Sequence, residues 1–225
     1  MHYAQMPRKS LTKIDIKTFR DTFCQAAYEL YVQDGYEAVT MRGVAKMLGS
    51  SPMMAYRYFD NKEDVFVSIR AMRFNDLAQA LGDVNDTLSP VEYLRELGMA
   101  YAGFAHKAPD AYRLLYMIPI DPRNISQNGV KEQQRTKKIL YEAACRLIDL
   151  GGSKGDPQLL AHTLWASIHG LVSLDLAGQL TQGANFNEIF PAMLDSVIRA
   201  EKNTSGKFSL LGEQHEESTL DASNG

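Results

Sequence analysis

Residues 39–63 read VTMRGVAKMLGSSPMMAYRYFDNKE, and the first half of this stretch predicts a short helix. Thr40 is a suitable N-cap, and apolar residues recur at helical spacing between Met41 and Leu48. Gly49 then supplies a stop, because glycine readily adopts the left-handed conformation in which many helices end. The first helix therefore has about two turns.

The second half of the stretch predicts another short helix. Ser50 or Ser51 can act as its N-cap, and Pro52 then stands at the first helical position, where a missing N–H costs no intrahelical hydrogen bond. The helix continues through Arg57, and Asn61 can cap a third helix. Two short helices joined by about three residues have the outline of a helix-turn-helix.

The composition of the second helix indicates a partner. Tyr56, Arg57 and Tyr58 make so short a helix unusually aromatic and basic, and DNA is the physical candidate for what it faces. The N-terminal residues of such a helix enter the major groove, while hydroxyls and backbone N–H groups at helix starts bind phosphates. Lys62, in the first turn of the third helix, opposes the macrodipole, so a phosphate contact explains it better than helix stabilisation.

Nine residues in this stretch are candidates for DNA contacts. Met53 and Met54 are equally compatible with thymine methyl groups and with the core, and Arg57 with a guanine, a phosphate or plain solvent exposure. Tyr58 and Phe59 are expected to pack the domain. The candidates are Thr40, Arg42, Ser51, Pro52, Met53, Met54, Tyr56, Arg57 and Lys62.

The region from Lys17 to Arg70 resembles the DNA-binding domain of TetR-type repressors. The chain departs from the family pattern at Val44 and Val65, and more consequentially at Ser50 and Ala55, where the family usually has valine and leucine. The resemblance is carried by Phe19, Ala26, Ala27, Leu30, Gly35, Thr40, Val44, Ala45, Gly49, Ser51, Tyr56, Tyr58, Phe59, Lys62 and Glu63. It implies a C-terminal helical domain that dimerises and holds a small ligand.

The composition is that of an ordinary globular protein. The chain has 225 residues, of which 45% are apolar and 23% charged, and its net charge is −3. Residues 1–75 carry 11 lysines and arginines against 8 acids, whereas residues 76–225 carry 13 against 19, so the basic end holds the helix-turn-helix. Cys24 and Cys145 lie on apolar faces, as buried thiols of a reducing compartment do. With no signal peptide and no apolar run long enough to span a bilayer, we expect a cytoplasmic location and no membrane partner.

The rest of the chain predicts an all-α protein with two domains. Besides the helix-turn-helix, helices are expected over 17–34, 62–82, 90–107, 109–117, 131–150, 158–179 and 186–200, with a loop over 119–129. The predicted organisation is a flexible basic arm over 1–16, a DNA-binding domain over 17–62, a helical ligand-binding and dimerisation domain over 63–202, and a disordered tail over 203–225.

The helix predicted over 158–179 is apolar on nearly every side. Such a helix must be covered all round, which indicates both an intramolecular core and a partner subunit. Together with the last helix, it would form a four-helix interface between two copies of the chain. Residues 164–170, LWASIHG, resemble the Trp-His-Gly signature of one subgroup of TetR-type C-terminal domains.

Large side chains at helical spacing in the second domain are candidates for an effector pocket, although most such residues belong to a core. Trp165 and His169 are i,i+4 neighbours on one helix face. His162 and His169 share a face without a carboxylate or cysteine, so neither a metal nor another cofactor is expected. The pocket candidates are Tyr101, Phe104, Tyr116, Met117, Tyr141, Trp165 and His169.

These observations favour a ligand-responsive transcriptional repressor that binds a near-palindromic operator as a homodimer. One alternative is an all-helical enzyme or small-molecule carrier that retains a DNA-binding-like domain, but no catalytic motif supports an enzyme. Another alternative is an interaction module that binds protein through the methionine-rich helix. Binding to DNA fragments separates the three.

Overall fold

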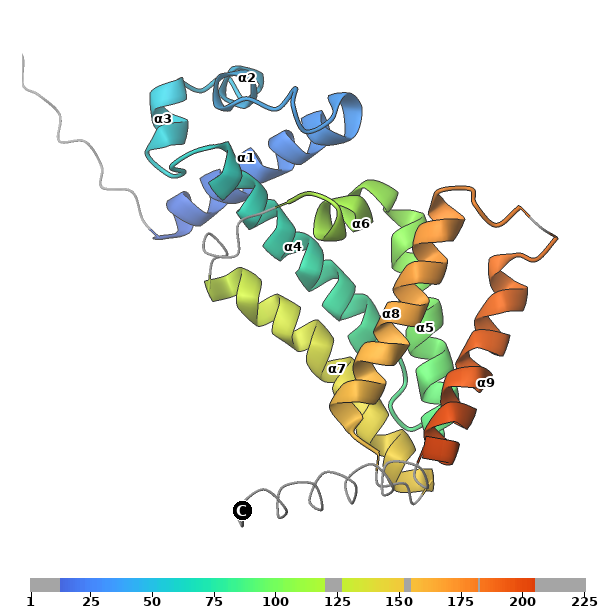
Figure 1. The fold of residues 1–225 in the computed structure, drawn as a ribbon. Helices are drawn as coiled ribbons and strands as arrows, with labels where there is room; N and C mark the ends of the chain where they lie inside the picture. Colours follow the sequence, from blue (N-terminus) through green and yellow to red (C-terminus); the bar gives the residue numbers. More distant parts are fainter. Residues whose placement is uncertain (1–12, 120–126, 152–154, 182, 205–225) are drawn as a thin grey trace, which may run out of the picture. The chain divides into compact units, whose positions relative to one another are not determined.

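A computed structural model describes residues 13–119, 127–151, 155–181 and 183–204, and the secondary structure within these ranges is entirely helical (Figure 1). The all-α prediction is therefore confirmed. The helices are α1 (Lys13–Asp34), α2 (Met41–Met47), α3 (Pro52–Tyr56), α4 (Lys62–Gly82), α5 (Pro90–Lys107), α6 (Pro109–Tyr116), α7 (Gln127–Gly151), α8 (Pro157–Leu176) and α9 (Phe186–Thr204).

The chain forms two compact units. The first comprises Met1–Phe74 and Arg113–Lys131, and the second comprises Asn75–Tyr112 and Glu132–Gly225. The chain passes from one unit to the other within α4, within α6 and within α7. The first turns of α4 belong to the core of the first unit through Val65, Phe66 and Ile69, so they pack with the helix-turn-helix that precedes them.

The core of the first unit is built on the apolar stripe of α1. Phe23 and Ala27 are fully buried, and the Phe23 ring lies 5.2 Å from the ring of Phe59. Val44 of α2 and Ala55 of α3 are also fully buried against this core. The helix predicted from residue 17 begins four residues earlier, at Lys13.

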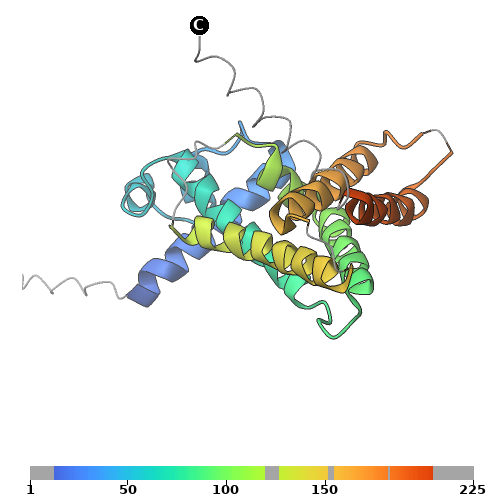
Figure 2. The same cartoon turned by 60° about the horizontal axis from the view of Figure 1, so that its bottom comes forward.

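The second unit is organised around α8, which packs against α5 and α9. Figures 1 and 2 both show α8 and α9 side by side. Contrary to the expectation from the sequence, α8 is long and apolar enough by composition to cross a bilayer. Its Leu164, Ile168 and Val172 are buried, as in the core helix of a globular domain, while Leu159 and Leu174 are 62% and 50% exposed.

Helix starts agree with the sequence where a capping residue marks them. The Ser89 hydroxyl and the Glu92 side chain form a capping box at α5, and the Asp156 carboxylate accepts from the Gln158 N–H at 2.8 Å. Helix α7, which no such cap introduces in the sequence, begins at Gln127, inside the predicted loop. The predicted basic arm, up to residue 12, and the predicted tail, from residue 205, lie outside the described residues.

Candidate functional site

The helix-turn-helix has the local structure that its sequence predicts. The Thr40 hydroxyl accepts from the Gly43 N–H at 3.0 Å, and the Ser51 hydroxyl accepts from the Met54 N–H at 3.3 Å. Pro52 occupies the first position of α3. Between the two helices Gly49 has a φ of +62°, a conformation that other residues rarely adopt.

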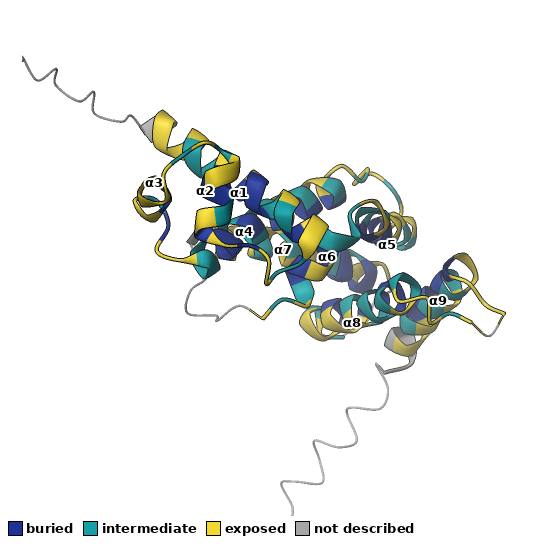
Figure 3. Cartoon of the chain, turned by 90° about the horizontal axis from the view of Figure 1, so that it is seen from above, coloured by how far each residue is buried: buried dark blue, intermediate teal, exposed yellow. Residues whose placement is uncertain are grey.

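One side of helix α3 packs against the core of the first unit, and the other side is exposed. Ala55 is fully buried, whereas Met53, Met54 and Tyr56 are 83%, 38% and 54% exposed. Figure 3 shows α3 largely in the colour of exposed residues. Neither methionine belongs to the core, so the core interpretation of these two side chains is excluded.

Eight of the nine predicted DNA contacts are exposed residues of the α2–α3 region, and only Lys62 is half-buried. The two residues predicted to pack do so, because Phe59 is buried and the Tyr58 ring lies 4.6 Å from Phe19. Contact of any of the nine with DNA stays a prediction.

Lys62 has an intramolecular role that the sequence did not indicate. Its ammonium donates to the Tyr36 carbonyl at 2.5 Å and lies 3.8 Å from the centre of the Tyr36 ring. The start of α4 is thereby tied to the turn between α1 and α2.

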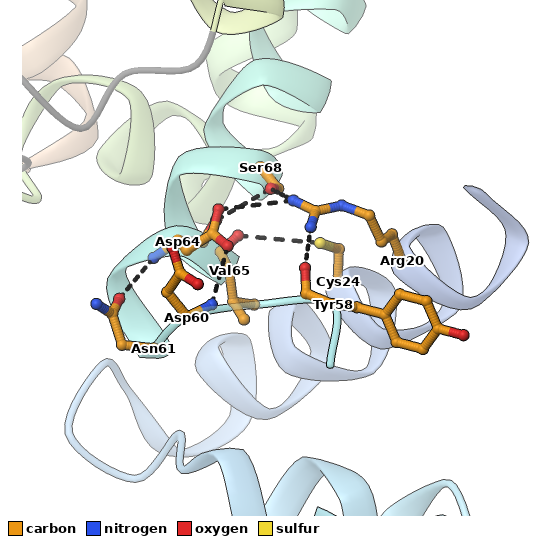
Figure 4. A network of polar contacts seen from close by, with 8 residues as sticks. All are labelled: Arg20, Cys24, Tyr58, Asp60, Asn61, Asp64, Val65 and Ser68. Atoms are coloured by element: carbon orange, nitrogen blue, oxygen red, sulfur yellow. Dashed lines mark hydrogen bonds and ion pairs between the residues drawn. The ribbon is translucent and has the colours of Figure 1, made fainter. Parts of the chain in front are cut away.

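Arg20, which sequence reasoning missed, fastens α1 to the end of the helix-turn-helix (Figure 4). Its guanidinium donates to the Tyr58 carbonyl and, at 3.0 Å, to the Ser68 hydroxyl. It also lies 4.1 Å from the centre of the Phe59 ring. The sequence offered one signal: Arg20 directly follows Phe19, and the next residue of the apolar stripe of α1, Phe23, comes about one turn later.

Cys24 lies beside this network with its Sγ 3.9 Å from the Val65 carbonyl oxygen (Figure 4). Burial raises the pKa of the Cys24 thiol to about 12. The thiol is therefore neutral and inert, as expected of a core cysteine.

A cluster of hydroxyl and imidazole groups lies inside the second unit. The Tyr112 hydroxyl is 2.6 Å from His169 Nδ1 and 3.4 Å from the Ser173 hydroxyl, and the Tyr101 hydroxyl is 3.1 Å from the same imidazole nitrogen. Burial raises the pKa of Tyr112 and lowers the pKa of His169. The neutral forms of both groups are therefore favoured.

The predicted effector residues only partly come together. Tyr101 and His169 belong to this cluster, and the Trp165 ring lies 5.9 Å from the His169 ring. Phe104 is half-buried on α5 and Tyr141 is exposed on α7. Tyr116 and Met117 belong to the first unit, where the Tyr116 ring packs edge-on against Phe74.

Tyr112, the centre of the cluster, was not among the effector residues predicted from the sequence. The sequence placed it on a short helix without indicating which face is buried.

A groove of about 370 Å³ opens elsewhere on the second unit, between α5 and the start of α9. The Nε2 atom of His106 lies 2.7 Å from a carboxylate oxygen of Asp175 on the wall of this groove. The remaining lining residues are Met99, Ala102, Gly103, Asn185, Phe186 and Asn187.

An exposed helix-turn-helix followed by a separate helical unit defines a DNA-binding transcriptional regulator of the helix-turn-helix class. The family model of bacterial regulatory proteins of the tetR family matches residues 24–69, and that of the tetracyclin repressor-like C-terminal domain matches residues 94–197. The chain belongs to the TetR family of transcriptional regulators.

Known proteins resemble the chain at low identity. An uncharacterized HTH-type transcriptional regulator of Mycobacterium tuberculosis is 22% identical over 165 residues, which are 72% of each chain. A protein of unknown function from Rhodococcus sp. RHA1 has a TM-score of 0.70 at 19% identity, covering 88% of this chain and 100% of that one. The regulator FadR of Bacillus subtilis, in complex with stearoyl-CoA, has a TM-score of 0.63 at 17% identity, covering 79% and 97%. The Trp-His-Gly subgroup stays a prediction.

Proposed function

We propose that the protein is a ligand-responsive repressor that binds a near-palindromic operator as a homodimer in the cytoplasm, and we assign it no catalytic activity. The observation that carries the proposal is the outward face of α3. A five-residue helix that exposes two methionines and a tyrosine, while one alanine anchors it, presents a surface for a partner. Each copy of α3 would enter the major groove of one half-site.

Contacts to the DNA backbone would surround this helix. Thr40, Ser51 and Tyr56 offer hydroxyl groups, and Arg42 and Arg57 offer exposed guanidinium groups. Lys62 can add a phosphate contact while keeping its bond to Tyr36, because an ammonium group has three donors.

Dimerisation would use α8 and α9. Leu159 and Leu174 are separated by 15 positions, which places them about 60° apart around the helix and hence on one face. Thr163, Ala166 and Ala177 are also exposed on this face. A second copy of the chain would cover this apolar strip, and the two-fold axis would explain a near-palindromic operator.

The effector would bind in the second unit, beside the cluster of Tyr101, Tyr112 and His169. The complex of FadR with stearoyl-CoA supports a small-molecule effector for a protein of this fold. Binding of the effector would release the operator only if the effector has a higher affinity for a conformation in which the two copies of α3 no longer fit successive major grooves.

The experiment is selection of operator sequences from a random DNA library with the full chain, followed by binding measurements at several salt concentrations. We expect Tyr56→Ala to weaken operator binding about tenfold, as the loss of one good contact does. Tyr141→Ala is the matched control, because Tyr141 is an exposed tyrosine outside the first unit. Lys62→Met should reduce the slope of log affinity against log salt by about one. No selectable DNA, or full binding by both first-unit variants, would contradict the proposal.

A further inference from the structure

We propose that Met53 is the residue through which the protein recognises the C5-methyl group of a thymine in each operator half-site. This inference rests on the proposed function, and it specifies the chemistry that α3 reads. Both methionines lie outside the core, and Met53 is the more exposed of the two, at 83% against 38% for Met54.

The geometry of α3 places Met53 at the centre of the exposed face. Successive residues of a helix turn by about 100°, so Met53, two positions before the buried Ala55, points about 160° away from it. Met54 and Tyr56 lie about 100° to either side of Ala55. The exposed fractions of the side chains follow this order, at 83% for Met53, 54% for Tyr56, 38% for Met54 and zero for Ala55.

Among the residues that the structure describes, Met53 is also the most exposed large apolar side chain. Covering an exposed, unbranched thioether side chain with an apolar surface removes it from water, which is favourable. Stability of the first unit does not account for this side chain, since its core is formed by other residues.

The chemistry of the first residues of α3 restricts which base they can read. Pro52, Met53 and Met54 have no side-chain hydrogen-bond donor. Guanine and adenine are usually recognised by hydrogen bonds with arginine, asparagine or glutamine, and cytosine by a carboxylate that accepts from its amino group. Thymine alone of the four bases offers a methyl group in the major groove. An apolar contact with thymine is therefore the direct readout that Met53 can perform.

The test removes the methyl group without changing any hydrogen bond. In the selected operator, each thymine of one half-site is replaced in turn by deoxyuridine, and binding of the full chain is measured. We expect one or two positions at which affinity falls about fourfold, the factor that corresponds to roughly 0.8 kcal/mol for one buried methyl group. Met53→Ala should weaken binding to the thymine operator by a similar factor and show no further loss on the deoxyuridine operator.

Met47→Ala is the matched control, because Met47 is a 53% exposed methionine on α2, and this variant should keep the full methyl dependence. Met53→Leu should keep most of it, since leucine can cover the same methyl group. Operator binding that is indifferent to every thymine methyl, or a methyl dependence unchanged in Met53→Ala, would overturn this inference and leave the proposed function standing. A chain that binds no DNA would overturn both, and would point to a protein partner for Met53.

Discussion

Two cations hold the first unit together at positions where the backbone leaves helices. Arg20 donates to the carbonyl of Tyr58, just after α3, and Lys62 donates to the carbonyl of Tyr36, between α1 and α2. Carbonyl groups at such positions lack helical partners and must find others. Each cation also lies over an aromatic ring, so both residues fix the helix-turn-helix by hydrogen bonding and by cation–π contact.

Replacement of Arg20 tests this account. Arg20→Ala removes hydrogen bonds to Tyr58 and Ser68, and we expect it to lower the free energy of unfolding by about 1.5–3 kcal/mol, the range for hydrogen bonds to a charged group. Urea unfolding followed by circular dichroism measures the loss. Lys17→Ala is the control: the ion pair of Lys17 with Asp21 on the same helix is solvent-exposed and should contribute less than about 1 kcal/mol. Equal effects of the two substitutions would contradict the assigned role.

His169 makes the stability of the second unit depend on pH. Because burial lowers its pKa below the ordinary value of 6.5, the unfolded chain binds a proton at this site more readily than the folded chain does. The free energy of unfolding should therefore decrease as the pH falls through 6.5, until the folded pKa is also passed. Urea titrations at pH 8, 6 and 5 should give a flatter profile for His169→Gln than for the unmodified chain, and parallel profiles would count against this effect.

At the scale of helices, two glycines of α5 have opposite surroundings. A Cβ atom on Gly98 would overlap the ring of Phe190 on α9, whereas a Cβ atom on Gly103 would meet nothing within 4 Å. Gly98 therefore leaves room for the Phe190 ring against α5, and Gly103 carries only the entropic cost of a glycine in a helix.

We expect Gly98→Ala to destabilise the second unit by about 1–3 kcal/mol, as overpacking does. Gly103→Ala should instead stabilise the unit by up to about 1 kcal/mol, because alanine has the higher helix propensity. Thermal unfolding of the two variants at equal protein concentration compares them directly. Phe190→Leu should restore part of the stability lost in Gly98→Ala, and failure of this rescue would show that the ring is not the obstacle.

The sequence predicts those features of the fold that are encoded locally. Thr40, Ser51 and Ser89 each mark a helix start within three residues of the backbone group that they cap, so the beginnings of α2, α3 and α5 could be predicted. The cluster of Tyr112 and His169 joins residues 57 positions apart, and only tertiary packing brings them together. The buried side of α3 could not be assigned for the same reason, because Ala55 is held by distant residues.

At the scale of the whole molecule, the face of α8 that this chain leaves uncovered determines the expected assembly. A helix with the composition of α8 is stable in water only if most of its apolar surface is covered, yet Leu159 and Leu174 remain half or more exposed. Adjacent α9 adds Ile189, Met193 and Val197, which are partly exposed at four-residue spacing. Two copies of this combined surface can cover each other around a two-fold axis.

A charge on this surface should therefore separate the subunits. Leu174→Glu places a carboxylate where two apolar faces meet, and burying it without a partner costs more than the contact provides. We expect sedimentation to show a dimer for the unmodified chain and a monomer for Leu174→Glu. Leu150→Glu is the matched control, because Leu150 is a 63% exposed leucine at the end of α7 and its replacement should leave the mass of the dimer unchanged.

The monomeric variant should also have an operator affinity at least about a hundredfold lower, since it engages each half-site separately. A dimer that survives Leu174→Glu would exclude this face, and operator affinity unaffected by the loss of the dimer would remove the reason for a palindromic site.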